Sequence, residues 1–439
     1  MGFLLWLVTK AVKKRGQRVV ETLTEVNFRS ALTHFRACVL ILTAVCILAV
    51  DFHIFPRRFA KTEIHGVSLM DFGVGAFVFC AALVHPFFRT LLYRRSIESQ
   101  AWYKHLILLV LGIIRDVVND SVNYQKHMSE YGRNWNFFIT FGAVSLVLSL
   151  LHWMITPTVS VRRKDNTPAI SVSGVWLGLC LATTLGLAML GIQTGFLLHQ
   201  QEFTVCMASQ PGEQKKLMSG LDYVLHDGTR FIQDCRGKLP TGHSPLSFWI
   251  AANREGLVSL PGYIALACFT IVAMLPMLSI AENTEPARGQ NLTRESGRVY
   301  FNFRITAWML GFLLFLGICG HLVPTESNIA LLIRVSRRLC NIGYIFVILV
   351  AGIILLFLQS WSFGDPRGLK RGYQPTKLHT LVNRNAMIYF IGSNLLTGLV
   401  NLSMNTMTTS DFNAFFILLG YFCLTFLFPY AQSLMQSQS

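Results

Sequence analysis

The side chains most able to do chemistry lie in one short run, residues 51 to 75, between two apolar segments that are each long enough to cross a bilayer. Six charged side chains occur there: Asp51, Arg57, Arg58, Lys61, Glu63 and Asp71. Charges at a membrane boundary are costly unless they are paired, hydrated or used, so this cluster predicts a functional site. The alternative is an interfacial loop whose cations anchor lipid headgroups, with Asp51 capping a helix or paired with Arg57 or Arg58.

A second polar group lies inside an apolar segment near the C-terminus. Asn394, Thr397, Asn401 and Asn405 follow one another at steps of three or four residues, which places them on one face of a helix. Polar amides in a bilayer face the protein interior or a wet cavity. This stripe therefore predicts either a polar substrate cavity or hydrogen bonds between helices.

Charged and amide residues also stand at the heads of two other apolar segments. Asn253 and Arg254 precede one of them, and Arg337 and Arg338 precede another. Arginines at such positions either clamp a phosphate with two hydrogen bonds or anchor the ends of the helices. Both interpretations remain open from the sequence.

Long apolar segments must position all of these residues. The chain has 439 residues, of which 52% are hydrophobic and 14% charged, and its mean hydropathy is +0.47. A bilayer core needs about 20 mostly apolar residues per helix. Ten segments are candidates: 36–51, 69–90, 104–118, 137–156, 174–198, 257–281, 305–323, 339–361, 386–404 and 412–431. The sequence predicts an all-α protein, a polytopic transmembrane helical bundle of about ten spans.

One membrane-embedded domain, residues 35–439, is expected to hold all of these segments, because no linker is long enough to separate a second domain. Residues 1–34 begin with a short apolar run and then carry several lysines and arginines. That pattern predicts a basic amphipathic helix that lies on a membrane surface.

The formal net charge of +16 does not by itself indicate nucleic acid. Basic loops beside a membrane bind anionic headgroups, and no nucleic-acid-binding motif accompanies the charge, so membrane lipids and no nucleic acid are the expected partners. Cys206 and Cys235 lie in the long polar loop 199–250, where a disulfide and two free thiols are both open. The other cysteines lie in or beside apolar segments as packing residues. No spacing of cysteine and histidine indicates a metal site, so no metal is expected. No cofactor is expected either.

The order of residues in the charged run is distinctive, and it is followed by further motifs. From Asp51 to Gly75 it reads DF-x-x-FPRRFAKTE-x-x-G-x-x-x-MDFGVG. The later motifs are YQ-x-H-x-x-EYG at 124–132, WNFF at 135–138, NREG at 253–256 with GY at 262–263, SRR at 336–338 with Asn341, and NR at 383–384 leading to Ser393-Asn394 and Asn401. Together they resemble the GPI inositol-acyltransferase family (PIG-W type), from roughly Phe35 to the C-terminus.

The resemblance implies an enzyme of GPI-anchor biosynthesis in the endoplasmic reticulum membrane. It implies transfer of a fatty acyl chain, expected to be palmitoyl, from acyl-CoA as co-substrate to the inositol of glucosaminyl-phosphatidylinositol. Asp51 and Lys61 match the family's catalytic pair, in which a carboxylate removes the hydroxyl proton and a cation orients it or neutralises developing charge. The other candidates are expected to bind substrate: Arg57, Arg58, Glu63, Asp71, His127, Glu130, Asn136, Asn253, Arg254, Arg337, Arg338, Asn394 and Asn401.

Some positions depart from the family's pattern. Asp120, Lys126 and Asn134 stand where its members commonly have Lys, Glu and His, so a mechanism through a histidine at position 134 is excluded. Members usually carry more apolar segments before the Asp51 motif, so the N-terminus is expected to be short. A multi-pass lipid transporter or flippase is the alternative function, since a polar helix face within ten spans also suits a translocation path. A non-catalytic scaffold is a third.

Overall fold

The structure, a computed structural model, describes residues 28–62, 66–94, 102–121, 131, 134–162, 167–199, 253–281, 298–321, 333–362 and 375–438. Its regular secondary structure is helical apart from four short strands. The chain divides into two compact units. The first consists of Met1–Ala60, Pro276–Gly311 and Ala351–Ser439, and the second of Lys61–Leu275 and Phe312–Val350. The first unit holds Asp51 and the asparagine stripe, which consists of Asn394, Thr397, Asn401 and Asn405.

The predicted class, a helical membrane protein, is confirmed. Seven helices of the described chain are long and apolar enough to cross a membrane: Phe28–Ala49, Phe137–Thr158, Val172–Leu198, Glu255–Met277, Ile342–Ser360, Ala386–Ser403 and Asp411–Met435. The pair α4 (Leu69–Val84) and α5 (Pro86–Tyr93), bent by 48°, adds an eighth if it counts as one span. The other two predicted crossings fall on helices α6 (Trp102–Ser121) and α15 (Phe303–His321). The count of about ten spans stays a prediction.

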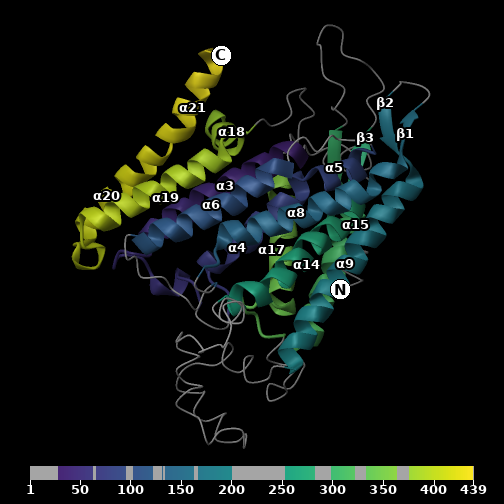
Figure 1. Cartoon of the computed structure of the whole chain (residues 1–439), viewed down its shortest axis with the longest axis horizontal. Coiled ribbons are helices and arrows are strands. Elements are labelled where there is room, and N and C mark those ends of the chain that lie inside the picture. Colours follow the sequence, from purple (N-terminus) through teal and green to yellow (C-terminus); the bar gives the residue numbers. More distant parts are fainter. Residues whose placement is uncertain are drawn as a thin grey trace, which may run out of the picture. The chain divides into compact units, whose positions relative to one another are not determined.

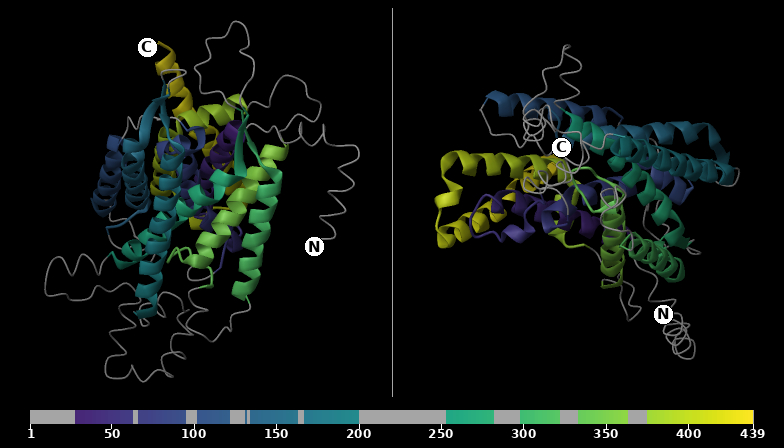
Figure 2. Two further views of the ribbon diagram at one scale, coloured as in Figure 1. Left: turned by 90° about the vertical axis from the view of Figure 1, so that its right-hand side faces the viewer. Right: turned by 90° about the horizontal axis from the view of Figure 1, so that it is seen from below.

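The first unit is built around α3 (Phe28–Ala49), which packs against α18 (Lys377–Arg384), α19 (Ala386–Ser403) and α20 (Asp411–Thr425). The purple α3 and the yellow-green α18 and α19 lie side by side in Figures 1 and 2. Leu48, Phe52, Ala414 and Tyr421 form a buried core between these helices. The unit also contains η1 (Arg57–Phe59), β3 (Leu278–Ala281), β4 (Arg298–Phe301), η4 (Thr406–Thr408) and α21 (Leu427–Gln438).

Tyr421 ties three helices of this unit together. Its hydroxyl donates to the carbonyl of Ala44 on α3 at 3.0 Å. The same oxygen lies 3.2 Å from the carbonyl of Ser393 and 3.2 Å from the hydroxyl of Thr397, both on α19. Buried polar groups must be paired, so this one hydroxyl fixes α19 and α20 against α3.

In the second unit, α8 (Phe137–Ile155) packs against α4, α5, α6 and α9 (Val172–His199). The bend between α4 and α5 falls at Pro86, which has no N–H to continue a helix and disfavours helical backbone at His85. His85 caps α5 instead, since its Nδ1 accepts from the N–H of Phe87 at 3.2 Å. One boundary between the units falls between Ala60 and Lys61, and the other three fall within α14 (Arg254–Met277), α15 and α17 (Ile342–Ser362).

Two antiparallel hairpins depart from the all-α prediction. β1 (Val159–Arg162) pairs with β2 (Thr167–Ile170), with Val159 opposite Ile170. In the other hairpin, Leu278 of β3 lies opposite Phe301 of β4. The predicted span 257–281 is therefore corrected, because its helix ends at Met277 and residues 278–281 form β3. A short apolar run fits a helix and a strand equally well, which is why the sequence did not separate them.

Several predictions concern residues outside the described chain. The basic N-terminal segment falls outside it up to residue 27, and α3 already begins at Phe28, eight residues before the predicted start of the first span. The loop with Cys206 and Cys235 also falls outside it.

Candidate active site

Asp51 lies in the turn that ends α3, where the sequence predicted it. After the helix, the N–H of Asp51 donates to the carbonyl of Leu48, and that of Phe52 to the carbonyl of Ala49, both at 3.1 Å. The Phe52 side chain is fully buried in the core of the first unit. Because Phe52 anchors the turn, the half-buried Asp51 carboxylate is held at the helix end.

The partner of Asp51 within its unit is Asn401, 350 residues later in the chain. The Nδ2 amide of Asn401, in the last turn of α19, donates to Asp51 Oδ2 at 2.8 Å. A hydrogen bond to an ionised carboxylate is stronger than a neutral one and fixes its orientation. No described residue of this unit donates to the other oxygen, Oδ1, so the carboxylate keeps an acceptor position.

The Asn401 amide is placed for this bond at a cost to stability. Only its NH2 group can face an anion, which settles the orientation of the side chain. Its carbonyl oxygen is buried and has no hydrogen-bond partner among the described residues. A buried acceptor without a donor is destabilising by about 1–3 kcal/mol. Such a group in a native fold calls for an explanation, and positioning of Asp51 supplies one.

Arg57 and Arg58 do not pair with Asp51. The Arg57 guanidinium donates to the carbonyl of Val50 at 2.7 Å and lies 3.7 Å from the sulfur of Met407. It thereby satisfies a carbonyl at the C-terminal end of α3, where helical partners are lacking. Arg58 is exposed, with its guanidinium carbon 5.0 Å from the centroid of the Phe59 ring. The structure therefore does not show the alternative arrangement, in which Asp51 pairs with Arg57 or Arg58.

The other residues of the asparagine stripe on α19, Asn394 and Thr397, make hydrogen bonds within the protein. Thr397 is buried against Tyr421, which is the hydrogen bonding between helices that the sequence left open. Asn394 is half-buried, and its amide donates within α19 to the carbonyl of Phe390 at 2.7 Å. Substrate binding by Asn394 stays a prediction.

Asn405 does not belong to the stripe. Helix α19 ends at Ser403, so the face predicted from the spacing stops before this residue. The Asn405 side chain caps η4 instead, accepting from the N–H of Met407 at 3.2 Å. The helical stripe is corrected accordingly and ends at Asn401.

Lys61, the other half of the predicted catalytic pair, is exposed and is the first residue of the second unit. Its role stays a prediction from the sequence. Three other candidates, Glu63, His127 and Glu130, lie outside the described residues. Arg254 is described only as the first residue of α14.

Asp71 and Arg337 form a buried ion pair. Asp71 is 0% exposed and Arg337 5%, and Nε of Arg337 donates to Oδ1 of Asp71 at 2.8 Å. The carboxylate also accepts from the N–H of Thr62 at 3.1 Å, from its hydroxyl at 2.8 Å and from the N–H of Ser68 at 2.9 Å. With Ser68 it forms the capping box that begins α4. These donors hold the buried carboxylate in place at the start of α4. Direct binding of substrate by Asp71 and Arg337 stays a prediction.

Two buried tyrosines, neither of them among the candidate site residues, complete this network. The Tyr344 hydroxyl donates to the carbonyl of Asp71 at 2.7 Å and accepts from the N–H of Gly75 at 3.1 Å. Tyr263 packs edge-on against it with ring centroids 6.4 Å apart, and its hydroxyl donates to the carbonyl of Arg337 at 3.5 Å. Their positions in the sequence could have indicated them, because Tyr263 follows Gly262 directly and Tyr344 lies shortly after the motif that carries Arg337.

Asn136 and Asn253 also have structural partners. Asn136 caps α8, accepting from the N–H of Phe138 at 3.0 Å, and its Nδ2 donates to the carbonyl of Gly112 at 2.8 Å. Asn253 is 0% exposed, and its Oδ1 accepts from the N–H of Asn134 at 2.8 Å. Both amides are buried in these contacts and support the fold. Their predicted contact with substrate stays a prediction.

Arg338 lies at the edge of this network. It is 12% exposed, and its guanidinium lies 4.0 Å from Glu255 in the first turn of α14. The ion pair joins the turn before α17 to the start of α14. A role of Arg338 in phosphate binding stays a prediction.

The GWT1 family model matches residues 2–205 and 240–431 of the chain. The chain belongs to the GWT1 family. Every candidate from Asp51 to Asn401 lies within the matched ranges. The resemblance that the motifs predicted is confirmed.

Curated relatives agree with the GWT1 assignment. Glucosaminyl-phosphatidylinositol-acyltransferase PIGW of Mus musculus is 30% identical over 425 residues, which cover 88% of this chain and 69% of the relative. GPI-anchored wall transfer protein 1 of Schizosaccharomyces pombe is 30% identical over 396 residues, which cover 89% and 70%. A protein of Arabidopsis thaliana is 29% identical over 422 residues, which cover 95% and 77%.

Proposed function

We propose that this GWT1-family chain is an inositol acyltransferase of GPI-anchor biosynthesis, which moves a fatty acyl chain from acyl-CoA to glucosaminyl-phosphatidylinositol. Membership of the family supports this reaction, as does the similarity to a mouse protein named for it. The apolar helices suit a membrane in which the lipid acceptor resides. The acyl-CoA donor and the endoplasmic reticulum as the location belong to the proposal.

The observation that carries the proposal is the Asp51–Asn401 hydrogen bond at the ends of α3 and α19. A hydroxyl of inositol is a poor nucleophile until a base removes its proton. Asp51 Oδ1 accepts that proton as the hydroxyl oxygen attacks the carbonyl carbon of the thioester. The tetrahedral intermediate then collapses, the C–S bond breaks, and the coenzyme A thiolate takes the proton from Asp51. Asn401 holds Oδ2, so that Oδ1 is the oxygen that exchanges the proton.

Negative charge develops on the thioester oxygen in this step and needs a cation or a hydrogen-bond donor. We assign that role to Lys61, which follows Asp51 in the same motif. Arg57 and Arg58 are exposed and suit the phosphate of the lipid acceptor or the diphosphate of the donor. We also propose that the bundle crosses the membrane about ten times, with the bent pair α4 and α5, α6 and α15 added to the seven long spans.

The test uses purified full-length protein in lipid nanodiscs with labelled palmitoyl-CoA and glucosaminyl-phosphatidylinositol. Wild type should yield an acylated lipid. Asp51→Asn keeps the size of the side chain but removes the proton acceptor, and should lower turnover by at least about 100-fold. Asn413→Ala, an exposed amide on α20, is the matched control and should retain turnover.

Folded wild-type protein that makes no acylated product contradicts the proposal. Movement of the labelled lipid between leaflets under the same conditions, without acylation, would identify a transporter. Full turnover in Asp51→Asn would instead keep the reaction and remove Asp51 from it.

A further inference from the structure

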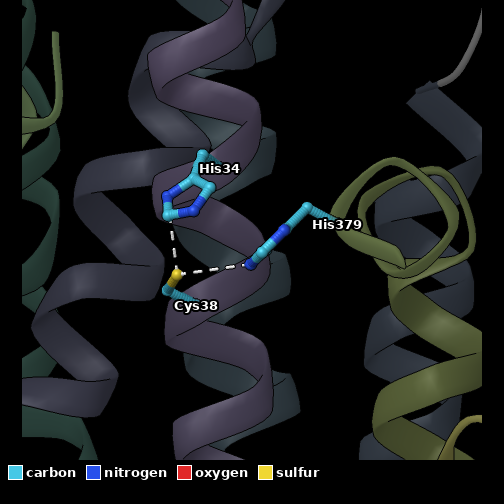
Figure 3. A group of neighbouring side chains, drawn as sticks. All are labelled: His34, Cys38 and His379. Carbon is cyan, nitrogen blue, oxygen red and sulfur yellow. Dashed lines mark hydrogen bonds between the residues drawn. The ribbon is translucent and has the colours of Figure 1, made fainter. Parts of the chain in front are cut away.

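A cluster of three metal-ligating side chains lies in the first unit, apart from the carboxylate at the end of α3. His34 and Cys38 are one helical turn apart near the start of α3, and His379 faces them from α18. The Cys38 sulfur lies 3.6 Å from Nδ1 of His34 and 3.8 Å from Nε2 of His379. Figure 3 shows the sulfur facing both rings. Each of the three side chains offers one ligand atom, and these three atoms all lie within 4.8 Å of one another.

Hydrogen bonding alone accounts poorly for this arrangement. A thiol has one proton and its sulfur accepts only weakly, so with two imidazoles it makes at most one weak donated and one weak accepted hydrogen bond. The two rings also lie close together, with centroids 4.2 Å apart. Zinc–sulfur and zinc–nitrogen bonds of about 2.3 and 2.0–2.1 Å in a tetrahedron place sulfur and nitrogen about 3.6 Å apart. The observed separations of 3.6 and 3.8 Å match those edges.

A hydroxyl beside the cluster selects the ring nitrogen that faces the sulfur. The Thr376 hydroxyl lies within hydrogen-bond distance of Nδ1 of His379, on the opposite side of the ring from Nε2. The same threonine caps α18 by accepting from the N–H of His379 at 3.3 Å. Metal-bound histidines generally have a partner of this kind on the other nitrogen, which fixes the orientation of the ring.

We propose that His34, Cys38 and His379 bind a single Zn²⁺ ion that clamps α18 to α3. One thiolate and two imidazoles are ligands that zinc favours, and three protein ligands leave a fourth position for water.

The proposed site serves the fold and not the acyl transfer. Cys38 on α3 precedes Asp51, which lies in the turn that ends this helix, by thirteen residues. At about 1.5 Å per residue the two are about 20 Å apart along α3. A metal at Cys38 is therefore too distant to polarise a thioester beside Asp51. It joins the first described helix to a segment more than three hundred residues later, since Cys38 and His379 are 341 positions apart.

Cobalt titration of the full-length protein in detergent, after treatment with a chelator, tests the site. Co²⁺ bound to a thiolate gives a charge-transfer absorption that histidine or carboxylate ligation alone does not give. Wild type should show this band with a stoichiometry of one, and Zn²⁺ should displace it. Cys38→Ser should abolish the band, and His379→Ala should weaken binding at least tenfold.

Matched variants separate ligation from general damage. Cys46→Ser removes a buried thiol two turns further along α3 and should leave the band intact. Thr376→Val keeps all three ligands and should weaken binding by roughly 10- to 100-fold, as loss of a hydrogen bond behind a ligand does, whereas Thr376→Ser should restore it. Zn²⁺ should raise the unfolding temperature of wild type and of Cys46→Ser but not that of His379→Ala. Absence of the band in folded wild type, or its persistence in Cys38→Ser, overturns the proposal.

Discussion

Removal of the Asn401 amide tests the geometry around Asp51 more sharply than removal of the carboxylate itself. Asn401→Ala deletes the hydrogen bond of 2.8 Å that fixes Oδ2 and leaves the proposed base in place. A hydrogen bond to a charged group contributes about 1.5–3 kcal/mol. Because Asp51 is only half-buried, water replaces part of the lost bond and the lower end of that range applies. Since about 1.4 kcal/mol corresponds to tenfold in rate, we expect kcat/KM to fall by about tenfold.

The loss should appear in kcat and not in KM, because Asn401 orients the base and does not bind the substrate in this proposal. The assay is the transfer of labelled palmitate to glucosaminyl-phosphatidylinositol in nanodiscs, with Asn413→Ala as the control on the neighbouring helix. Thermal unfolding of each variant shows whether the fold is retained. The buried carbonyl oxygen of Asn401 is removed as well, so stability should not fall by more than about 1 kcal/mol.

A double-mutant cycle decides whether Asn401 acts through Asp51. If it does, Asn401→Ala should lower kcat little further once Asp51→Asn is present, because the two side chains share one function. Fully additive losses in the double variant would refute this coupling. Unchanged kcat in a folded Asn401→Ala protein would refute the positioning role altogether.

Three further substitutions test the scaffold of the second unit through the unfolding midpoint of the purified protein. Asp71→Asn leaves its buried arginine partner without a counter-charge and should destabilise the protein by about 3–5 kcal/mol, and a loss below 1 kcal/mol would contradict the ion pair. Gly262→Ala places a Cβ against a backbone carbonyl and should cost about 1–3 kcal/mol. In the control, Gly191→Ala on α9, the new Cβ meets open space, so the substitution should stabilise the protein by about 0.5–1 kcal/mol. Asn136→Ala should cost about 1 kcal/mol or more as a lost helix cap, and Asn136→Asp should retain part of that stability.

The helices and the position of Asp51 could be predicted from the sequence because both depend on local pattern. Each predicted apolar segment contains a helix, and Asp51 lies in the turn that follows the first of them. The end of α19 before Asn405 could not be predicted, because the three- and four-residue spacing continues past Ser403, where the helix ends. Periodicity describes a helix face only as far as the helix extends.

Pairing between distant segments could not be predicted. Asn401 was a candidate, but its contact with Asp51 joins residues 350 positions apart, and nothing in the local pattern selects one partner among many. The same is true of Cys38 and His379, for which the sequence indicated no metal site at all. His34 and Cys38 have the i, i+4 spacing of residues on one helix face, yet two ligands without the third make no site.

Burial divides the two aspartates of the charged motif into different roles. The general rule that charges near a membrane are functional treats Asp51 and Asp71 alike. In the structure, the oxygens of Asp71 are enclosed by backbone and side-chain donors and by a guanidinium, so protonating it would break several bonds at once. Asp51 has one amide donor in its unit and keeps one oxygen for exchange. A general base must gain and lose a proton in every cycle without disturbing its support. Of these two aspartates, the one at the end of α3 meets that condition, so Asp51 is the candidate base and Asp71 supports the surrounding structure.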